Sequence, residues 1–360
     1  MSPPRQSPVR HDREGPLLEV SDLHTHFESA RGTVRAVDGV TFALERGRAL
    51  GVVGESGSGK TVLARTIMGL LPKRNVRTSG SVRFGGVELL GMSQRQMREL
   101  WGTEMAMVFQ DPMSSLNPLM RVGRQITEPL RHHMGMGKAD AIATAERLLR
   151  DVHIPEPARR LRQYPYELSG GTRQRVMIAI ALACGPNLLF ADEPTTALDV
   201  TVQAQILDLI AEQRRDRNMA VILVTHDLGV VANYTDEIAV MYAGRLVEKA
   251  PTRTLFSNMK MPYTKALLRS IPKLDLPSHT RLDTIPGRPP DLIHPPRGCR
   301  FAPRCAYARD RCTAEEPPLL AADSPDHTYA CWYPVGSPEH RERDEQLGRE
   351  KRVLAAEEVS

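Results

Sequence analysis

The sequence predicts an α/β fold built around a phosphate-binding loop, and three observations support this prediction. Residues 54–61 read GESGSGKT, which fills every fixed position of the phosphate-binding-loop pattern. The apolar run 49–53 before the loop is typical of a buried strand, and residues 62–71 after it place apolar side chains at helical spacing. Two later apolar runs, 187–191 and 220–225, end in polar residues, as strands do at the ligand-binding edge of an open parallel sheet.

The loop carries the groups that a bound phosphate chain needs. Glycines let the backbone curve closely around an anion, and backbone N–H groups at a helix N-terminus supply positive potential. We expect Lys60 to neutralise the β- and γ-phosphates and Thr61 to offer its hydroxyl to Mg²⁺. A glycine-rich turn with a chance lysine is the alternative. The predicted phosphate-binding residues are Gly54, Glu55, Ser56, Gly57, Ser58, Gly59, Lys60 and Thr61.

Composition limits the possible functions only loosely. The 360 residues exceed an average domain, so we expect one large domain with an appendage. The net charge of +5 could indicate nucleic acid or an anionic membrane surface, but the 48 basic and 43 acidic residues are interspersed. The apolar run 176–184 is far shorter than the roughly 20 residues that span a bilayer. We therefore expect a cytosolic protein whose membrane role, if any, depends on a partner.

The chain before the loop predicts a disordered leader followed by two strands. Residues 1–16 are rich in proline, arginine and serine. A first strand should end near Phe27 and a second lie at 40–44, with a polar turn at 29–32 between them. Phe27 is either a core residue or a platform that stacks on a nucleotide base.

Beyond the loop, residues 81–90 predict a further hairpin strand and Ser93 a helix cap. The run 105–110 reads as a strand that ends in Gln110. Helical spacing then dominates 126–152, which predicts a helical insert at about 93–183.

A second glycine pair lies at the start of an apolar helix within this insert. Ser169 can cap that helix, and Gly170 and Gly171 leave its first amides uncovered. The segment is either a second anion-binding site or a plain capped helix.

The two later strands end in candidate catalytic groups. Asp192 can hold Mg²⁺ through water and Glu193 can polarise an attacking water, although two helix-capping acids are the alternative. His226 ends the other strand at the same expected edge, which favours a phosphate contact over a structural role.

With these segments in order, the chain resembles the nucleotide-binding subunits of ABC transporters. GESGSGKT is similar to the Walker A motif, LSGGTRQ at 168–174 to the family signature, LLFADE at 188–193 to Walker B, and Ala197-Leu198-Asp199 to the D-loop. The resemblance implies a P-loop NTPase, RecA-like core with an antiparallel β subdomain and a helical ABC insert. It also implies Mg²⁺-dependent ATP hydrolysis.

Site roles follow from the resemblance, residue by residue. It implies that Gln110 senses the metal and the permease, that Glu193 activates water, and that His226 holds the γ-phosphate. It places Phe27 against adenine. Two such domains pair head to tail, so Ser169, Gly170, Gly171 and Asp199 would face ATP held by the partner. Thr172 departs from the glutamine or methionine of many members.

Further segments resemble the oligopeptide and dipeptide importer branch. They are FQDPMSSLNP at 109–118, YPYELSGG at 164–171, PYTKALL at 262–268 and the cysteine-bearing tail, with Met261 replacing a common histidine. The resemblance implies a sister ATPase subunit, two permease subunits, an indirect role for a substrate-binding protein, and a place on the cytoplasmic membrane face. Nickel is an alternative solute.

A soluble ABC ATPase that acts on nucleic acid or ribosomes is the alternative from another functional class. Such proteins usually carry two ATPase halves or a coiled-coil insert. This chain shows one set of motifs and no heptads, so we expect no nucleic-acid partner.

The tail predicts a small, loop-rich C-terminal domain with a metal site. Four clustered thiols in a reducing cytosol suggest a metal or an iron–sulfur cluster, and the absence of C-x-x-C pairs lowers zinc relative to a cluster. Free cysteines are the alternative. The resemblance implies a four-iron, four-sulfur cluster. Its thiols would be Cys299, Cys305, Cys312 and Cys331.

Two further expectations concern neighbouring residues. Cys184 lies in an apolar helix and is expected in the core, and four arginines near the thiols would offset a cluster's negative charge or form a solvated face. These arginines are Arg300, Arg304, Arg309 and Arg311. The predicted divisions are a leader at 1–16, a nucleotide-binding domain at 17–255, a C-terminal domain at 256–335 and a charged tail at 336–360.

Overall fold

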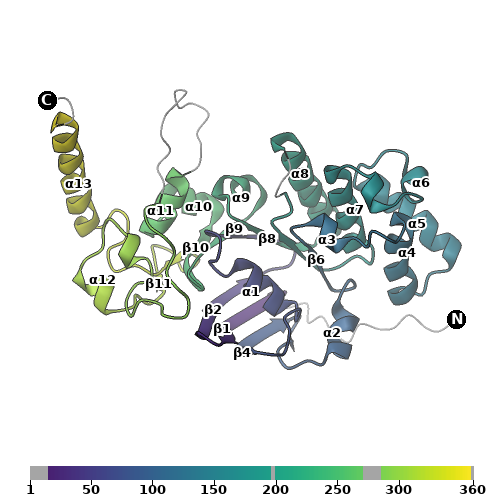
Figure 1. Ribbon diagram of the computed structural model, residues 1–360, viewed down its shortest axis with the longest axis horizontal. Coiled ribbons are helices and arrows are strands. Elements are labelled where there is room, and N and C mark those ends of the chain that lie inside the picture. The colour runs from purple at the N-terminus through teal and green to yellow at the C-terminus, as the bar shows by residue number, and fades with distance from the viewer. Residues whose placement is uncertain (1–14, 196–198, 271–284, 358–360) are drawn as a thin grey trace.

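The computed structural model describes residues 15–195, 199–270 and 285–357. Most of the predicted leader, and Ala197 and Leu198 of the D-loop, lie outside these residues. The described chain forms an antiparallel sheet, a mostly parallel sheet, a group of helices beside it and a C-terminal region, arranged along the long axis of the molecule (Figure 1).

The antiparallel sheet follows the predicted strands and extends them. Its order is β2-β1-β4-β5, and its strands are β1 (Leu18–Ser29), β2 (Gly32–Leu44), β4 (Val76–Phe84) and β5 (Val87–Glu88). In β1, Phe27 faces Val34 on one neighbour and Val76 on the other. This sheet therefore places Phe27 close to the end of the β1–β2 hairpin.

The second sheet carries the phosphate-binding loop in its middle. Its eight strands run in the order β11-β12-β10-β9-β3-β8-β7-β6. The central parallel strands are β3 (Ala49–Val53), β8 (Ala220–Thr225), β7 (Leu188–Asp192) and β6 (Met105–Val108). All their residues are buried, which explains their continuous apolar character. Because these strands are parallel, their carboxyl ends meet at one edge.

Helices cover this sheet and extend away from it. The first two are α1 (Lys60–Ile67) after the loop and α2 (Gln94–Leu100), where Ser93 and Gln96 form a reciprocal cap. After β6 come α3 (Pro112–Ser115), α4 (Val122–His133), α5 (Lys138–Asp151), α6 (Pro157–Arg160), the short 3-10 turn η1 (Pro165–Glu167) and α7 (Gly170–Leu182). Two more, α8 (Val200–Arg217) and α9 (Leu228–Tyr234), follow the later strands.

The helical insert begins later in the chain than residue 93. Strand β6 pairs with β7 in the core sheet, so the chain at 105–108 is part of the core and not of the insert. Helices α3 to α7 form the group on the right of Figure 1. The predicted start was too early because four core residues stand between two helices.

The C-terminal region is joined to the core sheet. From β9 (Glu237–Tyr242) and β10 (Arg245–Pro251), the sheet continues into β12 (Thr328–Tyr329) and β11 (Leu320–Ala321). His327 Nε2 lies 2.9 Å from Glu248 Oε1, and both side chains are buried. The cysteine-bearing region therefore adds two strands to the edge of the core sheet.

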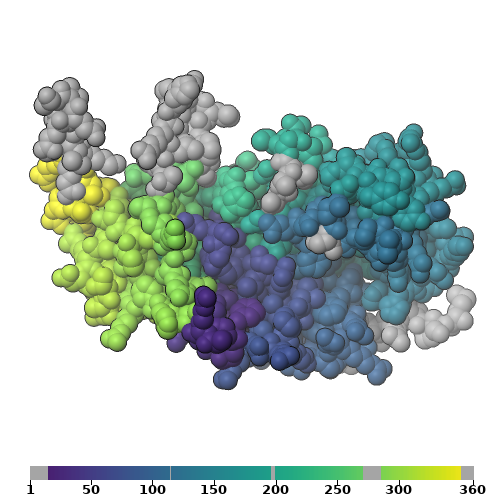
Figure 2. All heavy atoms as spheres, in the orientation of Figure 1, coloured from purple at the N-terminus to yellow at the C-terminus, as the bar shows by residue number. Residues whose placement is uncertain are grey.

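The remaining C-terminal elements are short helices and one long one. They are α10 (Thr252–Asn258), α11 (Pro262–Arg269), η2 (Ala302–Arg304), α12 (Asp310–Ala314) and α13 (Pro338–Glu357). The charged tail is thus helical through residue 357. In Figure 2 the yellow-green atoms of this region lie against the purple atoms of the first strands. A backbone hydrogen bond from Arg35 N–H to Leu292 O joins the two regions.

None of the described helices combines the length and the apolar character that a bilayer span requires.

Candidate nucleotide-binding site

The phosphate-binding loop requires glycine at its two ends. Gly59 has φ of 103° and precedes the first residue of α1. A Cβ at Gly59 would lie 2.2 Å from Ala36 O, and one at Gly54 would lie 2.1 Å from Met241 O. Both contacts are with backbone atoms, which cannot move aside easily. The two glycines therefore let the loop pack closely against β2 and β9.

Lys60 is held inside the loop. Its Nζ donates to Gly54 O at 2.7 Å and to Glu55 O at 3.0 Å, and the residue is 5% exposed. Burial lowers the pKa of Lys60, whereas the nearby carboxylates of Glu193, Asp192 and Glu55 act in the opposite direction. The ammonium group is therefore fixed at the loop by carbonyl oxygens and faced by acids.

Two of the three residues predicted at the Mg²⁺ site, Thr61 and Asp192, are in contact, and the third, Gln110, bonds to Glu193. Thr61 Oγ1 donates to Asp192 Oδ1 at 3.0 Å, although the residues are 131 positions apart. Burial raises the pKa of Asp192, while its hydrogen bond with Thr61 and the charge of Arg65 lower it. A hydroxyl and a carboxylate supply the oxygen ligands that Mg²⁺ prefers. The pair fits a magnesium ion bound beside the loop.

Glu193 follows β7 and is contacted by residues that follow the strands on either side of it, β6 and β8. Gln110 Nε2 donates to Glu193 Oε2 at 2.9 Å, and His226 Nδ1 lies 3.4 Å from Glu193 Oε1. Glu193 has φ of 45°, a left-handed conformation that non-glycine residues rarely adopt and that is common at functional sites. Its N–H donates to Val224 O at 2.9 Å. The carboxylate is thus oriented by the ends of β6, β7 and β8.

One cavity of about 800 Å³ joins these groups. This volume lies within the range of small-molecule sites. The predicted residues that line it are Phe27, Ser56, Gly57, Gly59, Lys60, Thr61, Gln110, Glu193 and His226. Further lining residues, which the sequence did not indicate, are Val34, Ala36, Val62 and Leu292. The half-buried ring of Phe27 therefore lies in the wall of the same cavity as the loop.

Gly54, Glu55, Ser58 and Asp192 do not line this cavity, although they belong to the loop or contact it. Four further predicted residues, in the family signature and the D-loop, lie away from it. Ser169 caps α7 by accepting from Thr172 N–H at 3.4 Å, as expected, and Gly170 and Gly171 begin that helix. Asp199 caps α8 by accepting from Val202 N–H at 2.9 Å. The structure does not bring these residues to the loop of the same chain, and Ser169, Gly170 and Asp199 are exposed.

The four tail thiols gather in one place. Cys299, Cys305, Cys312 and Cys331 all line a single small cavity, with Cys312 and Cys331 buried. Burial raises the pKa of Cys305 to about 12 and raises the pKa values of Cys299 and Cys331. Nearby thiols act in the same direction. A thiolate there is costly without a cation, so these thiols stay protonated when no metal is bound. Among the described residues, no three of the four sulfurs lie within 4.8 Å of one another, so the thiols as placed do not form a site for a single ion.

Two expectations, about Cys184 and about the arginines beside the tail thiols, were wrong. Cys184 lies just past the end of α7 and is only half-buried, although burial still raises its pKa to about 11. Arg300 and Arg304 were expected to offset the charge of a cluster or to form a solvated face. Both are instead buried in ion pairs with carboxylates far away in the sequence, Arg300 with Asp38 and Arg304 with Glu55.

Comparison with known proteins identifies the family. The family model described as "ABC transporter" matches residues 37–196, and that described as "Oligopeptide/dipeptide transporter, C-terminal region" matches residues 247–312. The oligopeptide transport ATP-binding protein OppD of Salmonella typhimurium is 50% identical over 319 residues, covering 89% of this chain and 94% of the relative. The chain belongs to the ATP-binding subunits of ABC transporters. This ABC ATPase is also 47% identical to the dipeptide transport ATP-binding protein DppD of Lactococcus lactis, over 89% of the chain and 91% of that relative.

Solved structures agree with the fold of the ATPase part. The cbiO1 protein of Clostridium perfringens, part of the cbiONQ ABC transporter complex, matches with a TM-score of 0.58 and 26% sequence identity. The match covers 68% of this chain and 92% of the cbiO1 chain. A bacterial ABC transporter cassette solved as a dimer has a TM-score of 0.59 at 25% identity, covering 66% and 99%. The predicted fold class is confirmed, and ATP with Mg²⁺ is the substrate complex of this family.

Proposed function

We propose that this ABC ATPase energises the uptake of dipeptides or oligopeptides through separate membrane permease subunits. The observation that carries the proposal is the C-terminal region matched at 247–312, which goes beyond the ATPase core that all ABC transporters share. Relatives named for oligopeptide or dipeptide transport match almost their full length. No comparable observation favours nickel or nucleic acid.

The arrangement of side chains supports in-line hydrolysis of ATP. Lys60 would neutralise the phosphates, and Thr61 and Asp192 would hold Mg²⁺, which would supply positive charge to the phosphate oxygens. Glu193 would take a proton from water as the water oxygen forms a bond to the γ-phosphorus. The bond to the β–γ bridging oxygen then breaks, and that oxygen leaves with ADP. His226 and Gln110 orient the Glu193 carboxylate.

The exposed family-signature residues support a head-to-tail pair of ATPase subunits. Ser169 and Gly170 are exposed at the N-terminus of α7, and Asp199 is exposed at that of α8. Bare amides at a helix N-terminus attract anions. We propose that these residues and Gly171 complete the ATP site of a second, sister subunit.

The segment after Gln110 offers a surface for the permeases. Met113 and Leu119 are 54% and 86% exposed, although both are large and apolar. A contact between this segment and two permease subunits would cover them and place the protein on the cytoplasmic face of the membrane. Gln110 then connects the permease to Glu193, and a substrate-binding protein would act only through the permeases.

The four tail thiols support a four-iron, four-sulfur cluster. They line one cavity, and burial disfavours free thiolates at Cys299, Cys305 and Cys331, a cost that a bound cation would offset. When bound, the cluster would be held by four Cys sulfurs. The cluster would crosslink and thereby stabilise a region that has few helices or strands.

Metal analysis of the anaerobically purified chain tests the cluster. We expect iron and acid-labile sulfide near four of each per chain, since four thiolates ligate one cubane cluster. Cys305→Ser should lose both, whereas Cys184→Ser should retain them because Cys184 lies after α7, away from the cavity. Zinc alone, or a metal-free protein, would contradict the cluster and leave the ATPase assignment intact.

Transport by the assembled complex tests the solute. The chain, its sister ATPase and the permeases in liposomes should accumulate a labelled dipeptide or oligopeptide when ATP and the binding protein are present. Uptake should stop when ATP is replaced by a non-hydrolysable analogue. Uptake of Ni²⁺ without uptake of peptide, or salt-sensitive binding of nucleic acid with no transport, would overturn the proposal.

A further inference from the structure

The second residue of the phosphate-binding loop is held at three points. The Glu55 N–H donates to Tyr263 Oη at 2.9 Å, and the Glu55 carbonyl accepts from Lys60 Nζ at 3.0 Å. The Glu55 carboxylate accepts two hydrogen bonds from Arg304. Tyr263 and Arg304 both belong to the C-terminal region. A residue of the ATP-binding loop is therefore fixed by a part of the chain that follows the whole ATPase core.

The contact between Arg304 and Glu55 has the geometry of a strong ion pair. Arg304 Nη1 lies 2.6 Å from Glu55 Oε2, and Nη2 lies 2.9 Å from Glu55 Oε1. The hydrogen bond to Glu55 raises the pKa of Arg304 against the opposing effect of burial. A bidentate pair fixes the orientation of both planar groups, which a single contact cannot do.

Arg304 is itself held rigidly on its other edges. Its Nε donates to Pro286 O at 2.8 Å, and Nη1 also reaches Tyr242 Oη at 3.3 Å. The Arg304 side chain is 4% exposed and that of Glu55 is 24% exposed. Because the guanidinium cannot relocate without losing several partners, it can act as a fixed support for the loop.

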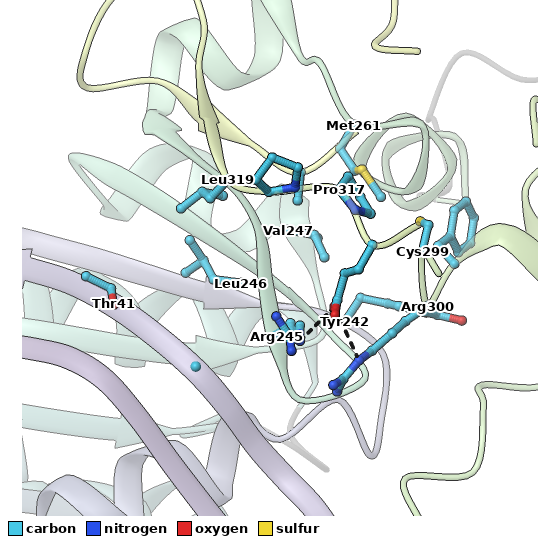
Figure 3. A pocket seen from close by; sticks show the side chains of 15 residues that line it. Thr41, Tyr242, Arg245, Leu246, Val247, Met261, Cys299, Arg300, Pro317 and Leu319 are labelled. Carbon is cyan, nitrogen blue, oxygen red and sulfur yellow. Dashed lines mark ion pairs between the residues drawn. The ribbon is translucent and has the colours of Figure 1, made fainter. Parts of the chain in front are cut away.

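The segment that carries Arg304 lies between two of the tail thiols. Cys299 precedes Arg300, and Cys305 follows Arg304 at the end of η2. Arg300 pairs with Asp38 of β2. Arg300 Nε also lies 3.9 Å from Glu316 Oε1, and Arg245 Nε lies 2.9 Å from the same oxygen. Dashed lines mark such ion pairs beside Arg300 and Arg245 in Figure 3. The short cysteine-flanked segment thus attaches to the nucleotide-binding core at two separate carboxylates.

We propose that Arg304 is a positioning residue for ATP binding, which holds Glu55 and thereby the phosphate-binding loop in the conformation that receives the phosphates. Arg304 does not line the nucleotide cavity, so it acts through Glu55 and not by touching ATP. A loop that is ordered before binding does not have to lose conformational freedom when the ligand arrives. Domain docking alone is the competing explanation, in which the pair stabilises the fold without affecting ATP affinity.

Nucleotide affinity of the full chain separates these explanations. We expect Arg304→Met to raise the dissociation constant for a fluorescent ATP analogue with Mg²⁺ by about tenfold, because the released loop must lose conformational freedom when the nucleotide binds. Arg304→Lys should bind the analogue more tightly than Arg304→Met but less tightly than the original protein, because lysine keeps the positive charge and cannot make the bidentate pair with Glu55. Arg311→Met is the control, since Arg311 pairs with Glu315 at 3.0 Å on the exposed surface of the same region. The Arg311→Met protein should bind the ATP analogue with the same affinity as the unsubstituted protein.

A double-mutant cycle shows whether the effect passes through Glu55. In a Glu55→Gln background, Arg304→Met should weaken ATP binding much less than it does in the original chain. Full additivity of the two substitutions, or unchanged affinity in a folded Arg304→Met protein, would overturn the proposal. Circular dichroism and thermal unfolding monitor folding. If Arg304→Met does not fold, the cycle with Arg304→Lys decides: a lowered affinity that depends on Glu55 supports the proposal, and unchanged affinity overturns it.

Discussion

Replacing Glu193 by Gln is expected to abolish ATP hydrolysis while ATP binding is retained. The amide has the shape of the carboxylate but cannot take a proton from water. Since a positioned base contributes roughly 10² to 10⁴ in rate, the turnover number should fall by at least about a hundredfold. Phosphate release by the chain with its sister subunit measures the rate, and equilibrium binding of ATP with Mg²⁺ measures affinity.

Glu212→Gln is the matched control for this substitution. Glu212 also lies near a histidine, with Oε2 3.8 Å from His153 Nε2, but on the exposed surface of α8. The Glu212→Gln protein should hydrolyse ATP at the same rate as the unsubstituted protein. If Glu193→Gln kept the original rate, the assignment of Glu193 as the base would fail, and the hydrogen bond from Gln110 would have only a structural meaning.

The core of the site could be predicted because its signals are local. A buried strand, a glycine loop and a helix follow one another within residues 49–67, so the pattern specifies the structure directly. The contact between Thr61 and Asp192 is not local, yet it follows from the rule that parallel strands end at one edge. The same rule places Glu193 and His226 together.

The attachment of the C-terminal region could not be predicted from the sequence. Glu55 and Arg304 are separated by 249 positions, and an arginine beside a cysteine has no pattern that names its partner. Strands β11 and β12 have two residues each, too few for a period-2 signal. Leu292 lines the nucleotide cavity from a proline-rich stretch without regular elements.

The predicted thiol site illustrates an intermediate case. The sequence could identify which cysteines belong together because Cys184 lies far from the other four along the chain. The structure then places those four around one cavity. The spacing, which lacks C-x-x-C pairs, lowers zinc relative to a cluster, and the cavity adds no further preference because both accept four thiolates.

The contacts of Glu193 suggest how permease movement reaches the reaction. The carboxylate is held by Gln110, which directly precedes the exposed segment with Met113. A shift of that segment would move the Gln110 amide and with it the orientation of Glu193. The opposite side of the site is held by the C-terminal region through Glu55. The phosphate-binding loop and the Glu193 carboxylate are therefore supported by different parts of the molecule.

Replacing Lys60 by Met is expected to abolish tight ATP binding, and hydrolysis with it. The substitution removes the buried ammonium proposed to neutralise the phosphates and leaves the carbonyls of Gly54 and Glu55 without this donor. Losing one partner of a buried charge pair costs roughly 2–5 kcal/mol of binding free energy. The dissociation constant should therefore rise on the order of a hundredfold.

Titration with a fluorescent ATP analogue measures this change, and the exposed Lys73 provides the control. Lys73→Met removes the same charge in the turn between α1 and β4 and should leave the affinity unaltered. Equal affinities for all three proteins would mean that phosphates are held by the loop amides alone. A loss confined to Lys60→Met, in a chain that still unfolds cooperatively, identifies the Lys60 ammonium as the principal phosphate-neutralising group of the loop.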